Sequence, residues 1–260
     1  MKKNRVYTIG VAALIAATML LSYSSVKLVH SVYRRVFPDV AVLKTSYPVA
    51  VNKEGHRIIY KFQKTKPAHW RRLRELPKRA VAAILMAEDS AFFQHRGYSP
   101  EGIRYAIEYN SRPGVKIKRG GSTITQQVVK NLFLTPEKKV TRKVRELLLA
   151  VEIERKYSKA KILETYLNIA EWGPGVYGIE QASRRYFQKS AANLTARDAA
   201  ILAFMLPNPN KYRHSVRDGE LTAFATRRVE AILERMWKTG NISDEEYTSS
   251  GYQDALPSNL

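Results

Sequence analysis

Two carboxylates, Glu88 and Asp89, stand where an apolar stretch of the chain, residues 81–87, comes to an end. Phe92 and His95 follow shortly after them. A carboxyl group beside an apolar segment loses hydration, which raises its pKa and suits it to accept a proton as a general base. The alternative is structural, with Asp89 or His95 closing a loop at a charged helix end. The pattern alone leaves both interpretations open.

A second group of polar residues follows the glycine pair at 120–121, which leads through Ser122 into a segment of helical periodicity, residues 123–134. Backbone N–H groups and the helix dipole at such a start favour an anion. Three polar side chains, at spacings of three and four, would share one face of this helix: Gln127, Lys130 and Asn131. That face suits phosphate or sugar hydroxyls, although the spacing of a nucleotide-binding phosphate loop is absent. The alternative is a solvated helix face behind an ordinary Ser or Thr cap.

A third group places five cations around a single carboxylate, Glu146. The cations are Lys138, Lys139, Arg142, Lys143 and Arg145. Arg142 and Glu146 are four residues apart and would share a helix face. Positive side chains of this kind stabilise an anionic leaving group such as a pyrophosphate. The alternative is a surface salt bridge that contributes less than about 1 kcal/mol.

Helical patterns surround these three groups and must position them. Helices are predicted from residue 73 onward and over 123–134, 141–156, 159–168 and 222–239, with further starts at Thr195 and Ser243. Pro207 and Pro209 are expected to stop the helix that starts at Thr195. Gly240 is expected to cap the C-terminal end of the helix over 222–239. Four apolar residues define the predicted buried face of 141–156: Val144, Leu147, Leu148 and Val151. Residues 36–70 contain β-like runs at 40–43 and 58–62, and they are expected to be irregular or briefly extended.

The N-terminal segment contains a run of 21 uncharged residues, 6–26. As a helix it would be roughly 31 Å long, close to the thickness of the hydrocarbon layer. A cleaved signal peptide is the alternative, but the stretch is long and no A-x-A site follows it before Lys27. The sequence therefore predicts an uncleaved single-span anchor. Positive residues flank both of its sides, so charge does not decide its orientation.

The composition indicates a folded protein with an anionic partner. The chain of 260 residues has 44 Lys and Arg against 23 Asp and Glu, a net charge of +21, and 45% of its residues are hydrophobic. The absence of cysteine excludes a disulfide scaffold, a cysteine nucleophile and thiolate metal sites. No nucleic-acid motif accompanies the charge, so we expect an anionic membrane leaflet and substrate but no nucleic acid. Five cations are predicted to contact the leaflet: Arg71, Arg72, Arg74, Lys78 and Arg79.

Five sequence blocks, in this order, resemble the conserved blocks of the family 51 glycosyltransferases, the peptidoglycan glycosyltransferases that polymerise lipid II. The blocks are Glu88–Gly97, Gly120–Asn131, Arg142–Asn168, Gly175–Phe187 and Pro207–Tyr212. The run Gly-Gly-Ser-Thr-Ile-Thr-Gln-Gln-x-x-Lys-Asn is the most specific of them. The likeness covers about residues 76–212, over half of the chain. The short length and the N-terminal span resemble the monofunctional members, so no transpeptidase domain is expected.

The resemblance implies a role for each matching residue. Glu88 matches the general base that takes the proton from the 4-hydroxyl of the acceptor sugar, and Glu146 matches a second essential glutamate. The remaining matches concern substrate: Lys130, Arg142 and Lys138 for the donor pyrophosphate, Ser122, Gln127 and Asn131 as polar lining, and Asp89, Phe92 and His95 as supporting residues. Lys138 stands where an Arg is common, which would replace a bidentate phosphate contact by a point charge.

A glycosidase also needs two carboxylates, but it must protonate a poor leaving group, whereas a sugar pyrophosphate leaves as a stable anion. The five cations therefore favour transfer from a diphospholipid over hydrolysis. The resemblance implies no obligatory cofactor and Mg²⁺ or Mn²⁺ as an optional one. The metal-binding residues are unknown, because no acidic cluster has the spacing of an all-protein site. A divalent ion would bridge the pyrophosphate and one carboxylate.

These inferences predict a mostly α protein with a lysozyme-like glycosyltransferase domain and an N-terminal transmembrane helix. The expected divisions are residues 1–35 for the cytoplasmic N-terminus and anchor, 36–70 for a connector and 71–260 for the catalytic domain. The protein is expected in the bacterial inner membrane as a single-pass protein with an extracytoplasmic catalytic domain. Its expected partners are lipid II, the growing glycan strand, membrane lipids and cell-wall synthesis or division proteins. The alternatives are a glycan hydrolase or lytic transglycosylase, and a catalytically silent membrane-tethered scaffold.

Overall fold

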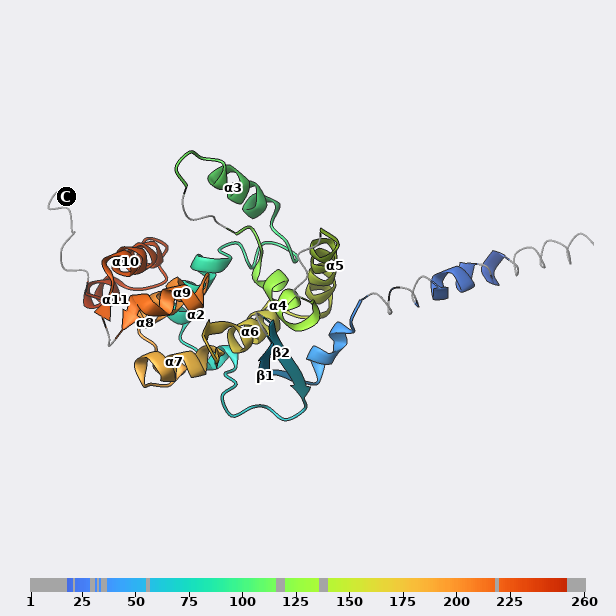
Figure 1. Ribbon diagram of the computed structural model, residues 1–260, viewed down its shortest axis with the longest axis horizontal. Coiled ribbons are helices and arrows are strands. Elements are labelled where there is room, and N and C mark those ends of the chain that lie inside the picture. The colour runs from blue at the N-terminus through green and yellow to red at the C-terminus, as the bar shows by residue number, and fades with distance from the viewer. Residues whose placement is uncertain are drawn as a thin grey trace, which may run out of the picture. The chain divides into compact units, whose positions relative to one another are not determined.

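The computed structural model describes residues 18–20, 22–28, 31, 33, 37–54, 57–115, 120–135, 140–217 and 220–251 (Figure 1). The chain divides into two compact units, residues 1–40 and 41–260. In the first unit the described stretches 18–20 and 22–28 are helical and exposed. Most of the predicted anchor lies outside the described residues. Within the described part of the chain, no helix is both long and apolar enough to span a bilayer.

The second unit includes an antiparallel hairpin of β1 (Tyr47–Glu54) and β2 (Arg57–Gln63). The β-like run 58–62 is therefore confirmed as a strand. The other run, 40–43, belongs to the 3₁₀ helix η1 (Val40–Lys44), so the β prediction was wrong there. A run of four apolar residues is too short for its period to separate helix from strand. The hydroxyl of Tyr60 donates to the carbonyl of Ile169 over 2.7 Å, which fastens the hairpin to the helical part.

The rest of the second unit is mainly helical, which confirms the mostly α prediction. Its α-helices are α2 (Lys78–Glu88), α3 (Pro100–Asn110), α4 (Ile124–Phe133), α5 (Val140–Lys156), α6 (Lys159–Ile169), α7 (Ile179–Phe187), α8 (Ala196–Met205), α9 (Pro209–Tyr212), α10 (Ala223–Lys238) and α11 (Asp244–Ser249). Short 3₁₀ helices lie at η2 (Leu73–Glu75), η3 (Ala191–Asn193) and η4 (Arg213–Ser215). Two small hairpins complete it, β3 (Glu171–Gly173) with β4 (Val176–Tyr177), and β5 (Val216–Arg217) with β6 (Glu220–Leu221).

Two groups of helices carry the residues of interest. In one group α2, α8 and α10 pack against each other, and in the other α4 packs against both α5 and α6 (Figure 1). The first group is built on small apolar side chains, such as Ala83 on α2 and Ala200 on α8, which are fully buried and let the helix backbones approach. The C-terminal end of α2 reaches the second group, so the two groups meet near Glu88.

The helix starts follow the sequence closely. Thr123, Thr195 and Ser243 each cap a helix through a reciprocal capping box, and Thr222 caps α10. Gly240 follows the end of α10 with φ of 68°, the left-handed conformation expected after a helix. The start of α3 was not predicted. Its N-cap is Ser99, whose hydroxyl accepts a hydrogen bond from the backbone N–H of Gly102 over 2.9 Å.

The buried face of α5 differs from the predicted one. The structure buries the face of Glu146, Leu149, Ala150 and Ile153. Val144 and Leu148 are 52% and 49% exposed, so their assignment to the core was wrong. Both stripes have helical spacing, and the sequence alone does not say which of them meets a neighbouring helix. The buried face of α5 therefore carries a glutamate, Glu146, and a buried carboxylate needs partners for its charge.

Candidate active site

Glu88 is the last residue of α2, and its partly exposed side chain is held by two further helices. Gln127 on α4 donates a hydrogen bond from Nε2 to Glu88 Oε2 over 2.6 Å. The hydroxyl of the buried Tyr166 on α6 lies 3.4 Å from Oε1 of the same amide and donates to it. Because the amide oxygen faces Tyr166, the NH₂ group is directed at Glu88. Three helices therefore fix the position of this carboxylate.

The surroundings of Glu88 disfavour its charge. Burial raises the pKa of Glu88, while the hydrogen bond from Gln127 and the charge of Lys130 act in the opposite direction, and the charge of Asp89 adds to the rise. The net result is a raised pKa, as expected for a carboxyl group that is ready to take a proton. A pKa raised by burial together with specific neighbours is a feature of functional sites.

Lys130 lies one helical turn along α4 from Gln127 and interacts with both glutamates. Burial lowers its pKa, the charges of Glu146 and Glu88 raise it, and the cations Arg142 and Lys143 lower it further. The lysine thus stands in a field to which Glu88 and the cations of α5 both contribute. Lys130 therefore connects the motif at Glu88 with the cations around Glu146, a connection that the sequence patterns did not predict.

Glu146 on α5 is buried and already neutralised. Lys143 donates to its Oε1, and Arg142 Nη1 donates to its Oε2 over 3.2 Å. Lys143 Nζ also donates to the hydroxyl of Ser122 over 3.0 Å, which joins the start of the second block to α5. Nε of Arg142 is buried and has no hydrogen-bond partner among the described residues. An unpaired buried guanidinium donor is costly, and an anionic ligand would satisfy it.

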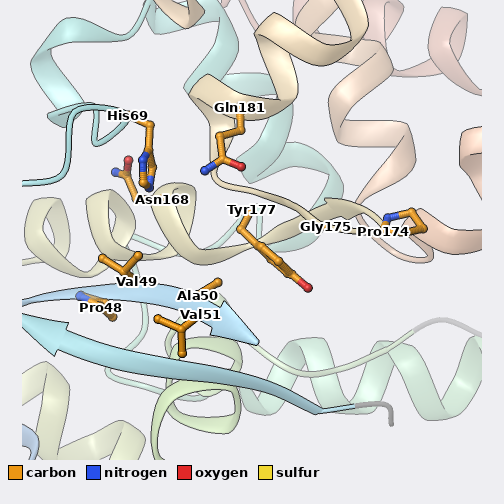
Figure 2. Close-up of a pocket in the computed structure, with 10 residues that line it drawn as sticks. All are labelled: Pro48, Val49, Ala50, Val51, His69, Asn168, Pro174, Gly175, Tyr177 and Gln181. Carbon is orange, nitrogen blue, oxygen red and sulfur yellow. The ribbon is translucent and has the colours of Figure 1, made fainter. Parts of the chain in front are cut away.

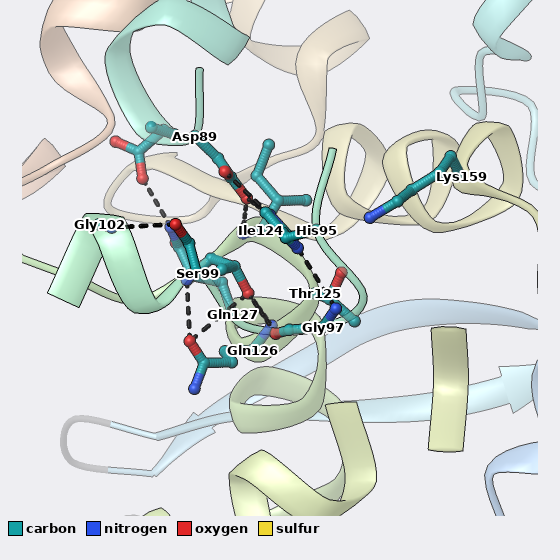
Figure 3. Close-up of polar contacts among 12 residues, drawn as sticks. Asp89, His95, Gly97, Ser99, Gly102, Ile124, Thr125, Gln126, Gln127 and Lys159 are labelled. Atoms are coloured by element: carbon teal, nitrogen blue, oxygen red, sulfur yellow. Dashed lines mark hydrogen bonds and ion pairs between the residues drawn. The ribbon is translucent and has the colours of Figure 1, made fainter. Parts of the chain in front are cut away.

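Asp89 and His95 form a brace under the site (Figure 3). His95 Nε2 lies 3.0 Å from Asp89 Oδ2, and the backbone N–H of Ile124 donates to the same oxygen over 2.9 Å. His95 Nδ1 accepts from the N–H of Gly97, so the hydrogen-bond network assigns the proton to Nε2, which donates to Asp89. Phe92 is fully buried and packs edge-on against His95. All three side chains hold the loop that follows Glu88.

Asp89 also lies at the start of α4, where the sequence favoured an anion. The N–H of Ile124 is bonded to Asp89, and the Thr123 hydroxyl accepts from the N–H of Gln126. The carboxylate of Asp89 thus accepts from a backbone N–H at this helix terminus. The helix dipole stabilises the charge of Asp89, and Asp89 in turn fixes α4.

The remaining predicted residues have different placements. Asn131 lies beyond Gln127 on α4 and is partly exposed. Lys138, with its neighbour Lys139, lies outside the described residues. Glu88, Gln127, Lys130, Arg142 and Glu146 are brought together, and Ser122 joins them through Lys143.

A sequence model of the family described as "Transglycosylase" matches residues 55–237. The chain belongs to this transglycosylase family. The family resemblance of the sequence blocks is thereby confirmed, and the match contains every candidate residue named above.

Similar proteins of the transglycosylase family carry the name biosynthetic peptidoglycan transglycosylase. The relative from Aromatoleum aromaticum is 47% identical over 151 residues, 58% of this chain and 64% of the relative. The one from Alcanivorax borkumensis is 48% identical over 143 residues, 55% of this chain and 58% of the relative. The one from Thiobacillus denitrificans is 50% identical over 137 residues, 53% and 57%. The chain thus spans about three fifths of the length of these curated relatives.

The acidic and histidine side chains of the described residues bear on the question of a metal ion. In the described part of the chain, no three acidic or histidine side chains gather where they could hold an ion. The oxygens of Asp89 and Glu146 are engaged by protein donors. The optional divalent ion stays a prediction.

Two residues of the site had been given no separate role. Lys143 was counted only as one of five cations, although it joins Glu146 to Ser122. Tyr166 lies in the third block but carried no assignment. The sequence does place Tyr166 among apolar residues of a predicted helix, and a buried tyrosine hydroxyl needs a hydrogen-bond partner, so a polar contact of Tyr166 could have been predicted.

Proposed function

We propose that the protein is a peptidoglycan glycosyltransferase that polymerises lipid II into β-1,4-linked glycan and releases undecaprenyl pyrophosphate. The observation that carries the proposal is the desolvated Glu88, held by Gln127 within the field of the Lys130 and α5 cations. A base beside a cluster of cations is what transfer from a sugar pyrophosphate requires.

In this mechanism Glu88 removes the proton from the 4-hydroxyl of the acceptor sugar. The oxygen forms a bond to C1 of the donor sugar while the bond between C1 and the pyrophosphate oxygen breaks, with inversion at C1. The proton ends on Glu88, and the electron pair leaves with the pyrophosphate. Lys130 and Arg142 stabilise that negative charge, and the unpaired Nε of Arg142 supplies a donor for it.

Glu146 has a different role from Glu88. Its carboxylate accepts hydrogen bonds from the side chains of Arg142 and Lys143. We assign it to holding Arg142 and Lys143 in position for the pyrophosphate.

We further propose that the domain works at the outer surface of the bacterial inner membrane, with residues 6–26 as a single-pass anchor. Five exposed aliphatic side chains support a membrane-facing surface: Ile103 and Ile107 on α3, and Val140, Val144 and Leu148 on α5. The membrane lipids would then be a partner, as expected from the charge. Cell-wall synthesis or division proteins are further proposed partners.

The five basic residues predicted to contact the leaflet, which lie before α2 and in its first turn, divide into two sets. Arg71 pairs with Glu180 and Arg79 with Glu246, so these two stabilise the fold. Arg72, Arg74 and Lys78 are exposed, and we assign them to the anionic leaflet. The triple variant Arg72→Gln, Arg74→Gln, Lys78→Gln should bind acidic vesicles more weakly than wild type. Equal binding would contradict this assignment.

The deciding experiment incubates the purified full chain with labelled lipid II in detergent and separates the products by length. Long glycan that lysozyme digests supports the proposal. Glu88→Gln should lower the rate about a hundredfold to ten-thousandfold while substrate still binds. Absence of polymer with folded protein and added divalent ion would favour the scaffold. Shortening of added mature glycan would favour the hydrolase.

A further inference from the structure

A cavity of about 360 Å³ lies between β1, α6 and the hairpin of β3 and β4 (Figure 2). It is bordered by four β1 residues, Pro48–Val51, by the turn between β3 and β4, and by His69, Asn168 and Gln181. Tyr166 of α6 points to Gln127, whereas Asn168 bonds to the backbone of Arg71 and borders the cavity. Tyr166 and Asn168 are two positions apart, which separates them by about 200° around the helix axis, so the cavity and the candidate active site lie on different faces of α6.

The wall formed by β1 is the edge of a strand. Four consecutive residues of β1 border the cavity, and Figure 2 shows β1 between the cavity and β2. Among the described strands β1 pairs with β2 alone, and no β2 residue borders the cavity. The edge of β1 that faces the cavity therefore carries backbone N–H and C=O groups without a strand partner. Pro48 lies on it, as proline does on edge strands.

Polar side chains oppose this edge across the cavity. Figure 2 shows His69 and Gln181 on the side away from β1, together with Asn168. The side-chain amide of Asn168 bonds to the backbone of Arg71 and Glu164, whereas the side chains of His69 and Gln181 make no hydrogen bond to another described residue. Burial, and then the charge of Arg71, lower the pKa of His69, so its ring is neutral and has one donor and one acceptor.

The cavity is also uncharged. None of its lining residues is an Asp, Glu, Lys or Arg, in a chain of net charge +21. The lining therefore favours an occupant without charge that offers donors and acceptors to a strand edge on one side and to His69 and Gln181 on the other. An extended peptide backbone has this pattern on its two edges.

We propose that the cavity is a docking groove for an extended, uncharged segment of a partner protein, which joins β1 as a third strand. The main chain of the segment pairs with β1, and its other edge meets His69 and Gln181. A sugar would use its hydroxyls on the polar side chains but would not pair in series with a strand edge.

The test uses a pool of synthetic pentapeptides, acetylated and amidated, with Val, Ile, Thr, Ala or Gln at each position. Hydrogen exchange of the full chain in detergent is measured with and without the pool at millimolar concentration. Exchange at residues 47–51 should slow, with no comparable change in α4 or α5. The same pool with alternate N-methylated amides has lost the donors of one edge and should not protect β1.

A peptide selected from the pool is then labelled, and its affinity is measured by fluorescence anisotropy. The double variant His69→Ala, Gln181→Ala loses two hydrogen bonds and should bind about tenfold more weakly. Asn193→Ala, an exposed change on η3, is the matched control and should bind as wild type does. Polymerisation of lipid II should be unchanged in the double variant, so this test is independent of the proposed catalytic function.

Several results would overturn the proposal. One is the absence of any protection of residues 47–51 by the pool. Another is equal protection by the N-methylated pool, because strand pairing would then play no part. Protection of the same residues by diacetylchitobiose instead of peptide would assign the groove to sugar. Self-association of the wild-type chain that the double variant abolishes would assign it to a second copy.

Discussion

Removal of the Gln127 side chain tests how the site sets the ionisation of Glu88. Gln127→Ala deletes the donor that lies 2.6 Å from Glu88 Oε2. This bond stabilises the ionised carboxylate, so its loss raises the pKa of Glu88 above the already raised wild-type value. A hydrogen bond to a charged group contributes about 1.5 kcal/mol or more, which corresponds to about a tenfold change in the ionisation constant.

The assay is the pH dependence of kcat/KM for lipid II polymerisation. Glu88 acts as a base only when ionised, so the rate falls as pH drops through its pKa. In Gln127→Ala this acidic limb should move to higher pH, and at sufficiently alkaline pH much of the rate should return. Tyr166→Phe removes only the hydroxyl that orients the amide, and it should move the limb in the same direction by less.

Asn131→Ala is the matched control, because Asn131 lies on the same helix but has no hydrogen bond to Glu88. It should change the rate without moving the acidic limb. If Gln127→Ala lowers the rate equally at every pH, Gln127 contacts substrate instead of setting the ionisation of Glu88. A limb that moves to lower pH would refute the electrostatic reasoning altogether.

Three further results are expected. The pKa of Glu88 is higher in the folded than in the unfolded protein, so ionisation of Glu88 destabilises the fold as pH rises from the unfolded pKa through the folded pKa. Glu88→Gln should therefore raise Tm at pH 7 and leave it unchanged below pH 4. A lower Tm at pH 7 would contradict the burial argument. Asp89→Ala should cost about 2–5 kcal/mol in denaturant unfolding, since it leaves the Ile124 N–H and His95 unpaired, and a loss below about 1 kcal/mol would show that the brace is dispensable. Arg142→Ala should weaken binding of the pyrophosphate-bearing donor more than of pyrophosphate-free glycan in equilibrium binding, and equal losses would count against its assignment.

The local chemistry of the chain predicted the helix termini well. The caps at Thr123, Thr195 and Ser243 were visible because a capping residue and its partner are only three positions apart. The same holds for Gly240 after α10. These signals depend on nearest neighbours along the chain, so no knowledge of the tertiary structure was needed to read them.

Features decided by distant contacts were harder to predict. On α5, two stripes competed for the core, and the stripe with Glu146 was buried because Lys143 and Arg142 neutralise it. The hydrogen bond from Gln127 to Glu88 joins residues 39 positions apart, and no spacing rule relates them. The family resemblance supplied that grouping, whereas the residue patterns alone left each motif with a structural alternative.

The bond between Asp89 and the start of α4 has a consequence for the proposed base. Asp89 is covalently next to Glu88, so α4 is tethered to α2 within one residue of the proposed base. Because Glu88 ends α2 and Gln127 lies on α4, this tether holds the donor and the carboxylate of the 2.6 Å bond next to each other. The acid strength of the base therefore depends on a bond made by its neighbour in the chain as well as on its own contacts.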